Sequence, residues 1–459
     1  MIKVRFAPSP TGHLHIGNLR TAILNYLFAK KEKGIFLLRI EDTDTERSDY
    51  HYEASIIDDL KWIGIDWDEG PTRQSDRLEI YRGYAEALLK KGLAYRCFCT
   101  KEELEAMRRD ALKEGRPPVY SGRCRSIPED VVANLESQGR PYVIRFKSLR
   151  RPVIIKDLIH GQIRFPEHHV DDFIILRQDK RPSYNFAVVV DDMLMAITHV
   201  IRGADHIPNT PKQVMLFQVL GGTIPEYAHH PLLTGPDGRP LSKREGRLTI
   251  KDFREMGILP SALFNYTAMI GMGLKEEIMD KEMLIERFSL RSLSASDAVF
   301  DMDKLLWFNR WHIKRAPIEH ILTESGLSID QKGQVALLRE NAQTLVALKE
   351  LMKIFNQPAI TEEGMRYLLK TDGAAAIALE FRRLIIEDNR KDLEAIIDTL
   401  SKRLNIKKKK ELFMPLRVIS TGRTDGPPLS EIFQSIPNEI IIKRIDEYLN
   451  ITGTPFIAG

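Results

Sequence analysis

The segment from Arg5 to Lys30, RFAPSPTGHLHIGNLRTAILNYLFAK, constrains the fold of this chain more than any other part. Pro8, Pro10 and Gly12 separate a short stretch at Lys3–Phe6, which carries Val4 and Phe6, from apolar residues at helical spacing. Proline and glycine favour turns, and a spacing of three to four residues places side chains on one helix face. The segment therefore predicts a buried strand, a tight turn and an amphipathic helix.

Two histidines and a glycine stand at the predicted junction of turn and helix. They are His13, His15 and Gly17. A helix start offers unpaired N–H groups to phosphate, and glycine lets a ligand approach the backbone. Two imidazoles at such a position indicate polarisation of phosphoryl oxygens. On spacing alone, a plain strand-to-helix turn with two surface histidines explains the residues equally well.

The near-continuous apolar run Ile35–Ile40 is typical of a central parallel strand. Polar residues follow it directly, at the end of a strand where open α/β sheets bind ligands. Among them we expect Glu41 to hold an ammonium group, whereas Asp42 can be a plain helix cap. Further along, Asp76 and Glu79 form a capping-box pattern and predict a helix that begins near Asp76.

Two short motifs identify a family. The residues His15-Ile16-Gly17-Asn18, after the PSPTG turn, resemble the HIGH signature of class I aminoacyl-tRNA synthetases. The residues Pro240-Leu241-Ser242-Lys243-Arg244 resemble their second signature, the KMSKS loop. Both motifs occur in the expected order, which is more specific than either alone. Over nearly its whole length the chain resembles bacterial-type glutamyl-tRNA synthetases.

The resemblance implies an α/β fold with a Rossmann-like parallel-sheet catalytic domain, a small α+β insertion, a stem-contact region and an all-α C-terminal anticodon-binding region. A chain of 459 residues is too long for one core, which fits several domains. The expected segments are residues 1–95, the first catalytic half; 96–180, an inserted acceptor-end-binding domain; 181–310, the second catalytic half with the KMSKS-like loop and stem-contact region; and 311–459, the anticodon-binding region.

The resemblance also implies glutamate–tRNA ligase chemistry, in which ATP activates L-glutamate and tRNA receives it. His13 and His15 would stabilise charge on the α-phosphate, and Lys243 would neutralise the departing pyrophosphate with the help of Mg²⁺. The residues implied in ATP binding are Gly17, Ser242, Lys243 and Arg244. Asn18 stands where class I enzymes usually carry histidine, and it receives no catalytic role.

For glutamate, the resemblance implies a pocket of charged and neutral donors. Its expected residues are Arg5, Ala7, Ser9, Glu41, Tyr184 and Arg202. Arginine offers a bidentate fork to a carboxylate and leaves the neutral amide of glutamine with a poorer partner. At Ala204 the chain lacks a carboxylate that many relatives carry, so no role is assigned there.

The three cysteines, Cys97, Cys99 and Cys124, crowd into one segment. An odd, clustered set is a poor disulfide framework and favours a metal site, although close cysteines can also be unligated. The resemblance implies structural Zn²⁺. Ser126 stands where some relatives supply a histidine ligand, so Tyr120 or water is expected as the fourth ligand.

A net charge of +4 is too small to indicate nucleic-acid binding, so any RNA surface must be a local patch. Candidates in the helical C-terminal region are Arg382, Arg383, Arg417 and the run Lys407–Lys410. The start of the chain lacks an apolar leader and no run of about 18 apolar residues occurs, so we expect a cytoplasmic protein without membrane contact. A monomer is also expected.

Rival functions remain open at this point. The enzyme could charge tRNA(Gln) as well as tRNA(Glu), because the sequence does not locate the anticodon contacts. Glutaminyl-tRNA synthetases typically read PEP where this chain reads PSP, and carry β-barrels where it is helical. A catalytically inactive tRNA-binding homologue is the alternative from another class, and the presence of His13, His15 and Lys243 weighs against it.

Overall fold

The computed structural model describes residues 1–44, 46–115, 118–167, 169–235, 237–238, 248–273, 277–388 and 392–455. The chain divides into two compact units. The first comprises Met1–Asp252 and Leu263–Asp301, and the second comprises Phe253–Ala262 and Met302–Gly459.

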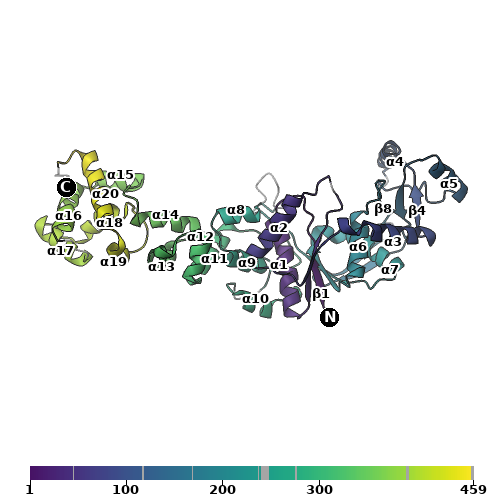
Figure 1. Ribbon diagram of the computed structural model, residues 1–459, viewed down its shortest axis with the longest axis horizontal. Coiled ribbons are helices and arrows are strands. Elements are labelled where there is room, and N and C mark those ends of the chain that lie inside the picture. Colours follow the sequence, from purple (N-terminus) through teal and green to yellow (C-terminus); the bar gives the residue numbers. More distant parts are fainter. Residues whose placement is uncertain are drawn as a thin grey trace. The chain divides into compact units, whose positions relative to one another are not determined.

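The first unit alternates strands and helices along the chain (Figure 1). Its strands are β1 (Lys3–Phe6), β2 (Ile35–Ile40), β3 (Glu69–Arg73), β4 (Ala94–Cys97), β5 (Val143–Phe146), β6 (Val153–Asp157), β7 (Gly161–Phe165), β8 (Ile174–Leu176), β9 (His199–Gly203), β10 (Glu226–His230), β11 (Leu233–Thr234) and β12 (Ala298–Val299). Its helices are α1 (Ile16–Lys31), α2 (Tyr50–Trp62), α3 (Leu78–Lys90), α4 (Lys101–Lys113), α5 (Glu129–Ser137), α6 (Tyr184–Leu194), α7 (Thr210–Leu220), α8 (Ile250–Glu255, which runs into the second unit), α9 (Pro260–Met269, which returns from it) and α10 (Lys281–Arg287).

Parallel strands form the centre of this unit. β1, β2 and β3 pair in that order and in parallel, and a second sheet has the order β7-β6-β10-β9, with β6, β10 and β9 parallel. The two sheets meet where the Thr198 N–H donates to the Lys3 carbonyl at 2.9 Å and the Lys3 N–H donates to Thr198 Oγ1 at 2.9 Å. The predicted Rossmann-like parallel-sheet fold is confirmed.

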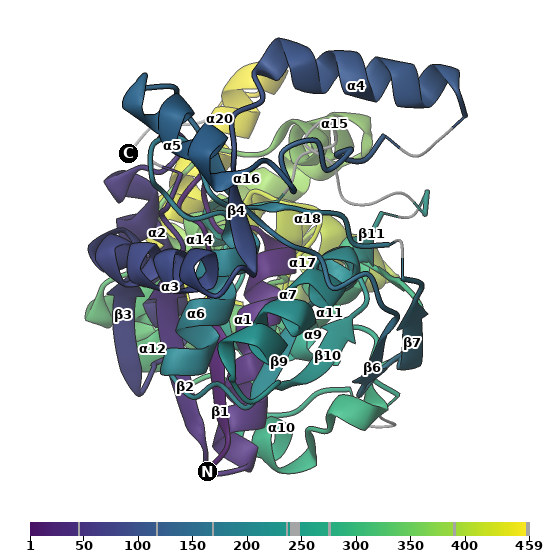
Figure 2. The ribbon, with the colours of Figure 1, turned by 90° about the vertical axis from the view of Figure 1, so that its right-hand side faces the viewer.

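Helix α1 packs against β1, β2 and β9, and Figure 2 shows it alongside β1. Leu19, Ile23 and Leu27 are buried, as the apolar spacing predicts. The polar side chains of Arg20 and Asn25 are also completely buried, because α1 is covered on nearly all sides. The prediction of a single apolar face was therefore too narrow for a helix inside the domain.

The segment predicted as an insertion contributes to two different sheets. β4, β5 and β8 form a small antiparallel sheet, as expected of an insertion with its own sheet. β6 and β7 do not join it, because β6 pairs with β10 in the second parallel sheet. Alternate residues of β6, Val153, Ile155 and Asp157, face inward and are buried, so this strand supports the catalytic core.

The predicted capping box at Asp76 is wrong. A single 3₁₀ turn, Ser75–Arg77, precedes α3, and the residue before α3 makes no side-chain cap. The Ser75 N–H and Oγ instead donate to the Asp42 carboxylate at 2.8 and 2.6 Å. Glu79 pairs with Arg82 one turn further along. The carboxylate at this helix start therefore comes from Asp42, which is distant in sequence, and it binds Ser75.

The second unit contains no strand among its described residues and consists of helices. They are α11 (Met302–Arg315), α12 (Ile318–Ser325), α13 (Lys332–Leu338), α14 (Leu345–Met352), α15 (Glu362–Lys370), α16 (Ala374–Asp388), α17 (Leu393–Arg403), α18 (Lys410–Thr421), α19 (Leu429–Ile432) and α20 (Asn438–Thr452). α16 packs against α18 and α20 through the buried side chains of Phe381, Leu416 and Ile445 (Figure 1). The predicted all-α C-terminal region is confirmed.

Among the described residues, no helix is both long enough and apolar enough to cross a lipid bilayer.

Candidate active site

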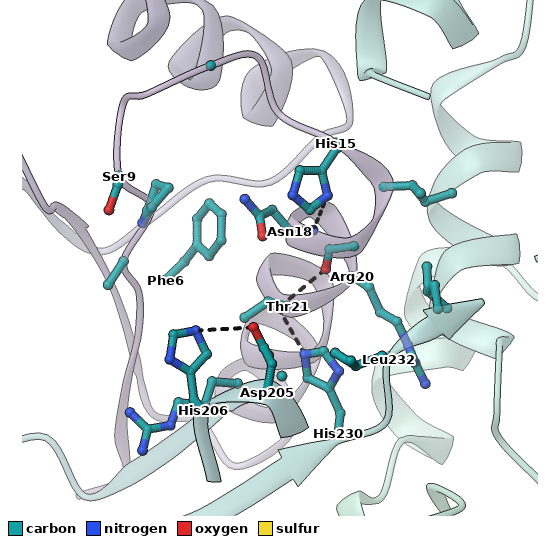
Figure 3. A pocket seen from close by; sticks show the side chains of 18 of the residues that line it. Phe6, Ser9, His15, Asn18, Arg20, Thr21, Asp205, His206, His230 and Leu232 are labelled. Atoms are coloured by element: carbon teal, nitrogen blue, oxygen red, sulfur yellow. Dashed lines mark hydrogen bonds and ion pairs between the residues drawn. The ribbon is translucent and has the colours of Figure 1, made fainter. Parts of the chain in front are cut away.

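A cleft of about 780 Å³ opens where β1, β2, β9 and β10 end. All nine predicted ATP- and glutamate-site residues that the structure describes line it: Arg5, Ala7, Ser9, His13, His15, Gly17, Glu41, Tyr184 and Arg202. Figure 3 shows His15 and Asn18 on one side of this cleft and Asp205 and His206 on the opposite side. The sheet therefore brings together residues that are almost 200 positions apart in sequence.

The turn after β1 is fixed to the elements beside it. The Glu41 N–H donates to the Pro8 carbonyl at 2.9 Å, and the Asp49 N–H donates to the Pro10 carbonyl at 3.0 Å. Proline has no backbone N–H, so Pro8 and Pro10 bind these neighbours only as hydrogen-bond acceptors, through their carbonyl groups. This pairing holds Ala7 and Ser9 between the end of β2 and the start of α2.

His15 caps the N-terminus of α1 with its side chain. The Asn18 N–H donates to His15 Nδ1 at 3.3 Å (Figure 3), which requires that Nδ1 carry no proton and leaves the neutral ring protonated at Nε2. A Cβ at position 17 would lie 3.2 Å from two atoms of this ring. Gly17 therefore makes room for the capping imidazole, in addition to any ligand.

Helix α2 holds His13 at the opposite side of the turn. Ser55 Oγ lies 3.0 Å from His13 Nδ1, and the Tyr52 ring packs edge-on against the imidazole with 5.2 Å between centroids. Tyr52 also lines the cleft, and sequence reasoning missed it. The exposed imidazole of His13 is thus oriented without being buried.

The KMSKS-like residues Ser242, Lys243 and Arg244 lie outside the described residues. Residues 237–238 before them and the residues from Leu248 onward are described. Leu248 and Thr249 line the cleft, and this segment pairs with the His15 segment, because the Ile16 N–H donates to the Leu248 carbonyl at 3.2 Å. The Ile250 N–H donates in turn to the Leu14 carbonyl at 3.0 Å.

A buried charge network supports one wall of the cleft. Arg5 is 4% exposed, and its Nε donates to Asp192 Oδ1 at 3.2 Å. Arg39 donates to Asp192 Oδ1 at 2.7 Å and to Glu41 Oε1 at 3.0 Å. Burial opposes ionisation, but Arg5 and Arg39 outweigh it and lower the pKa of Asp192. Neither Nη atom of Arg5 has a hydrogen bond to a described residue, so both can meet a ligand.

Arg202 provides a second cation. Its Nε donates to His229 Nε2 at 3.2 Å and its Nη2 donates to Thr210 Oγ1 at 2.9 Å. Its Nη1 is buried and has no partner among the described residues. A buried guanidinium N–H without a partner is costly, and Arg202 lines the cleft.

Tyr184, at the start of α6, adds a neutral donor. Its Oη lies 3.2 Å from His206 Nδ1. Burial raises the pKa of Tyr184 to about 12, so the phenol keeps its proton. Burial and the neighbouring Arg202 lower the pKa of His206 to about 4, so this imidazole is neutral at pH 7.

Sequence reasoning missed several residues that lie between these groups. Thr21 Oγ1 contacts His230 Nε2 at 2.9 Å, and Arg20 donates to the Pro231 carbonyl at 2.7 Å. Asp205 and His206 line the opposite side. The signal was present, because Asp205 and His206 come shortly after β9 and His230 is the last residue of β10, at the sheet edge where Glu41 follows β2.

The predicted residues give the cleft two arginines, one buried carboxylate and two histidines at a helix start. The arginines Arg5 and Arg202 suit carboxylates, Glu41 suits an ammonium group, and His13 with His15 suits phosphoryl oxygens. Burial raises the pKa of Glu41 while Arg39 and Arg5 oppose that effect. A positively charged ammonium beside Glu41 would favour its ionised form further.

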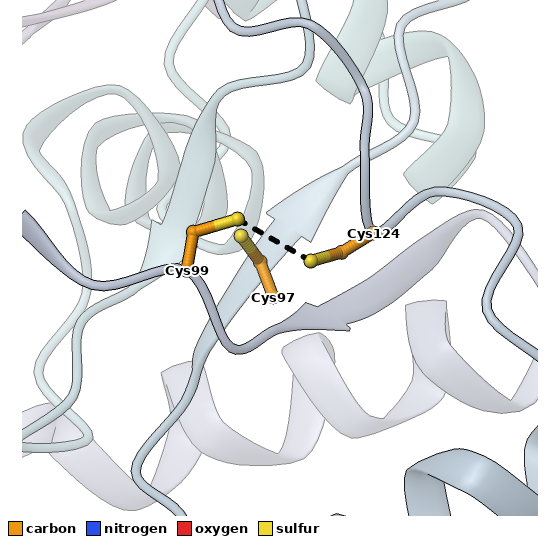
Figure 4. A group of neighbouring side chains, drawn as sticks. All are labelled: Cys97, Cys99 and Cys124. Atoms are coloured by element: carbon orange, nitrogen blue, oxygen red, sulfur yellow. Dashed lines mark hydrogen bonds between the residues drawn. The ribbon is translucent and has the colours of Figure 1, made fainter. Parts of the chain in front are cut away.

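A separate cluster contains the three cysteines (Figure 4). The sulfur atoms of Cys97, Cys99 and Cys124 lie within 4.8 Å of one another. Tyr120 Oη lies 3.4 Å from Cys97 Sγ and 3.7 Å from Cys99 Sγ. The hydrogen bond with Cys124 lowers the pKa of Cys97. Three soft sulfur donors close to one another fit Zn²⁺, and Tyr120 Oη is the oxygen beside two of them. Ser126 is exposed.

The basic residues predicted to contact RNA differ in their exposure and in their hydrogen bonds within the chain. Arg382 is 8% exposed and its Nε donates to Asp446 at 2.6 Å, so little of its side chain is accessible. Arg383 pairs with Glu380, and Arg417 donates to the carbonyls of Asp425 and Pro427. The side chains of the run Lys407–Lys410 are exposed, and Lys409 pairs with Asp398.

Comparison with known proteins shows two family matches. Residues 1–307 match the catalytic domain of class I tRNA synthetases (E and Q), and residues 301–449 match an anticodon binding domain. The chain is 40% identical to glutamate–tRNA ligase 1 of Caldicellulosiruptor saccharolyticus, over 97% of this chain and 98% of the relative. It is 42% identical to the glutamate–tRNA ligase of Aquifex aeolicus, over 97% and 98%.

Solved structures agree. A glutamate tRNA ligase from Elizabethkingia meningosepticum, crystallised in complex with its amino acid, superposes with a TM-score of 0.86 at 32% identity. That alignment covers 98% of this chain and 99% of the other. The glutamate–tRNA synthetase of Elizabethkingia anophelis gives a TM-score of 0.84 at 32% identity, over 98% and 99%.

Proposed function

The chain belongs to the glutamate–tRNA ligases, a family of class I tRNA synthetases, and from that membership we propose its reaction and the residues that carry it. It activates L-glutamate with ATP and transfers the glutamyl group to the 3′-terminal ribose of tRNA(Glu). One observation supports this most directly: Arg5, Arg202 and Glu41 meet in the same cleft as His13 and His15. The ligands that match these charges are a dicarboxylate that carries an ammonium group and, beside it, a phosphate.

In the first step, an oxygen of the glutamate α-carboxylate attacks the α-phosphorus of ATP. The bond to pyrophosphate breaks, and glutamyl-adenylate forms. Negative charge develops on the phosphoryl oxygens, so oriented donors lower the barrier. His15, whose Nε2–H is fixed by the helix cap, and His13 are placed to supply them. Lys243 neutralises the departing pyrophosphate. Mg²⁺ bound to the phosphates would share that charge, and no residue is assigned to it.

In the second step, the terminal ribose hydroxyl of tRNA attacks the glutamyl carbonyl and AMP leaves. No covalent enzyme intermediate is needed. Ser9 and Tyr184 complete the polar lining of the amino-acid pocket. The side-chain carboxylate of glutamate pairs with arginine, whereas the amide of glutamine would leave that buried guanidinium without a counter-charge.

The regions of the chain divide this work in our proposal. Residues 1–95 and 181–310 carry activation, residues 96–180 bind the acceptor end, and residues 311–459 read the anticodon region. We further expect a cytoplasmic monomer, with Zn²⁺ held by Cys97, Cys99, Cys124 and Tyr120. Bound there, Zn²⁺ would stabilise a small sheet that has little core of its own.

Aminoacylation with purified tRNAs tests the proposal. The parent chain should attach glutamate to tRNA(Glu), and should reject glutamine with either tRNA. Transfer of glutamate to tRNA(Gln) would identify the second candidate, an enzyme that charges both tRNAs. His15→Ala should lose ATP–pyrophosphate exchange in the presence of tRNA while it still binds tRNA. A parent protein that binds tRNA without exchange would instead be an inactive homologue.

A further inference from the structure

One histidine of the catalytic unit is completely buried behind the cleft and takes no part in the reaction described above. His229 has no exposed surface and is not among the residues that line the cleft. The register of the parallel strands β9 and β10 pairs its Cα with that of Arg202. Its ring lies between Arg202 on one side and Asp157, at the end of β6, on the other.

Asp157 is bound so completely that it can only accept hydrogen bonds. Its Oδ1 accepts from the N–H groups of Ile159 and His160, both at 2.9 Å. Its Oδ2 accepts from the His229 N–H at 3.1 Å and lies 2.6 Å from His229 Nδ1. A carboxylate that is saturated with donors requires a proton on Nδ1 of His229.

The protonation of the other ring nitrogen, Nε2, is then also fixed. With the proton on Nδ1, His229 Nε2 carries a lone pair, and it accepts the Arg202 Nε–H at 3.2 Å. Burial lowers the pKa of His229, which keeps the ring neutral. An imidazolium would instead point an N–H at the guanidinium and repel it.

Two contacts therefore hold the Arg202 guanidinium, and its third nitrogen makes no hydrogen bond to a described residue. Nε is bound to His229, Nη2 is bound to Thr210, and Nη1 is buried without a partner among the described residues. Arginine has many rotamers, and fixing one in advance reduces the entropy that ligand binding would otherwise cost.

We propose that Asp157 and His229 are positioning residues, which fix the Arg202 guanidinium so that Nη1 faces a carboxylate of bound glutamate. The proposal rests on the glutamate-binding role proposed above for Arg202. It also assigns a function to a strand, β6, that lies in the segment expected to bind the acceptor end of tRNA.

Two amide variants of His229 separate the two contacts of this relay, by which we mean the contact of Asp157 with His229 and that of His229 with Arg202. In His229→Gln, the amide oxygen can replace Nε2 as acceptor for Arg202. In His229→Asn, the amide N–H can replace Nδ1–H toward Asp157, but no acceptor reaches Arg202. The full-length variants are compared in steady-state aminoacylation at varied glutamate, ATP and tRNA. His199→Gln, a buried histidine on β9 outside the cleft, is the matched control.

We expect His229→Asn to raise the KM for glutamate about tenfold, as loss of one hydrogen bond to a charged group implies. The KM values for ATP and tRNA should change less than about twofold, and His229→Gln should stay near the parent. Asp157→Asn should raise the glutamate KM as well, since its amide would face donors. Equal effects of His229→Gln and His229→Asn on the glutamate KM would overturn the proposal.

A double-mutant cycle distinguishes this relay from a general loss of stability. Lysine at position 202 has no Nε–H donor, so His229→Asn should add little to the glutamate KM of Arg202→Lys, and additive effects would refute the relay. If Arg202→Ala leaves the glutamate KM unchanged, the role of Arg202 itself fails. If it raises that KM while His229→Asn does not, only the relay fails. Should His229→Asn not fold, a parent-like Asp157→Asn refutes the proposal.

Discussion

Replacing Arg5 by alanine tests the glutamate pocket most directly. The Arg5 side chain is 5% exposed and its partner Asp192 is 2% exposed, so the guanidinium acts in a poorly solvated site. Removing it leaves the carboxylate of bound glutamate without a counter-charge. Breaking a buried ion pair by removing one partner costs about 3 kcal/mol or more. We therefore expect the KM for glutamate to rise roughly a hundredfold.

The rest of the protein should tolerate this change better. Asp192 keeps Arg39 at 2.7 Å, so it does not become an isolated buried charge. We expect the free energy of unfolding to fall by about 1–2 kcal/mol, a common cost for a single substitution. The KM for ATP should change little, because the residues proposed for phosphate lie on the turn and on α1.

Steady-state aminoacylation and denaturant unfolding measure these quantities. Arg5→Lys keeps a charge but not the fork, so its glutamate KM should fall between those of the parent and Arg5→Ala. Lys3→Ala is the matched control, because Lys3 lies on the same strand and pairs with Glu69 outside the cleft. Equal increases in the KM values for glutamate and ATP would refute the reasoning and make Arg5 a structural residue of β1.

Three further predictions concern other parts of the chain. Lys243→Ala should raise the activation free energy of adenylate formation by about 3 kcal/mol and change the affinity for glutamate little. Activation at the parent rate in pre-steady-state kinetics would contradict this. Protein purified without chelator should contain about one zinc per chain, bound less tightly at low pH, and a metal-free, fully folded and active protein would contradict the site. Burial lowers the pKa of His230 from 6.5 to about 3, so the unfolded state takes up its proton first. The contribution of His230 to the free energy of unfolding should be complete above pH 6.5 and fall by up to about 1.4 kcal/mol per pH unit on acidification. If the free energy of unfolding of His230→Gln depends on pH as steeply as that of the parent, His230 is not the cause.

Local patterns predicted the elements around the first motif well. The strand Ile35–Ile40 has the predicted bounds, and the helix predicted after the first turn occurs at Ile16–Lys31. These elements depend on neighbouring residues only, through apolar spacing and turn residues. The rule that selected Glu41, a polar residue after a parallel strand, also applies to His206 after β9 and would have found it.

Long-range pairing could not be predicted in this way. Nothing near Ser75 indicates that Asp42 takes its donors, and nothing near Asp157 indicates that it meets His229. Both contacts depend on which strands become neighbours, and strand order is a property of the whole sheet. The buried network of Arg5, Arg39 and Asp192 was missed for the same reason, although Arg5 itself was identified.

The position of β6 limits how this enzyme can be dissected. Residues 96–180 look like a removable module, and a minimal catalytic core would be designed by joining residue 95 to residue 181. That deletion would remove β6, one of the two neighbours of β10, and expose the sheet edge at the buried Tyr227. Exposed sheet edges promote aggregation, so such a truncated core should precipitate. A chimaera that transplants the acceptor-binding part from a relative should therefore leave Val153–Phe165 with the host.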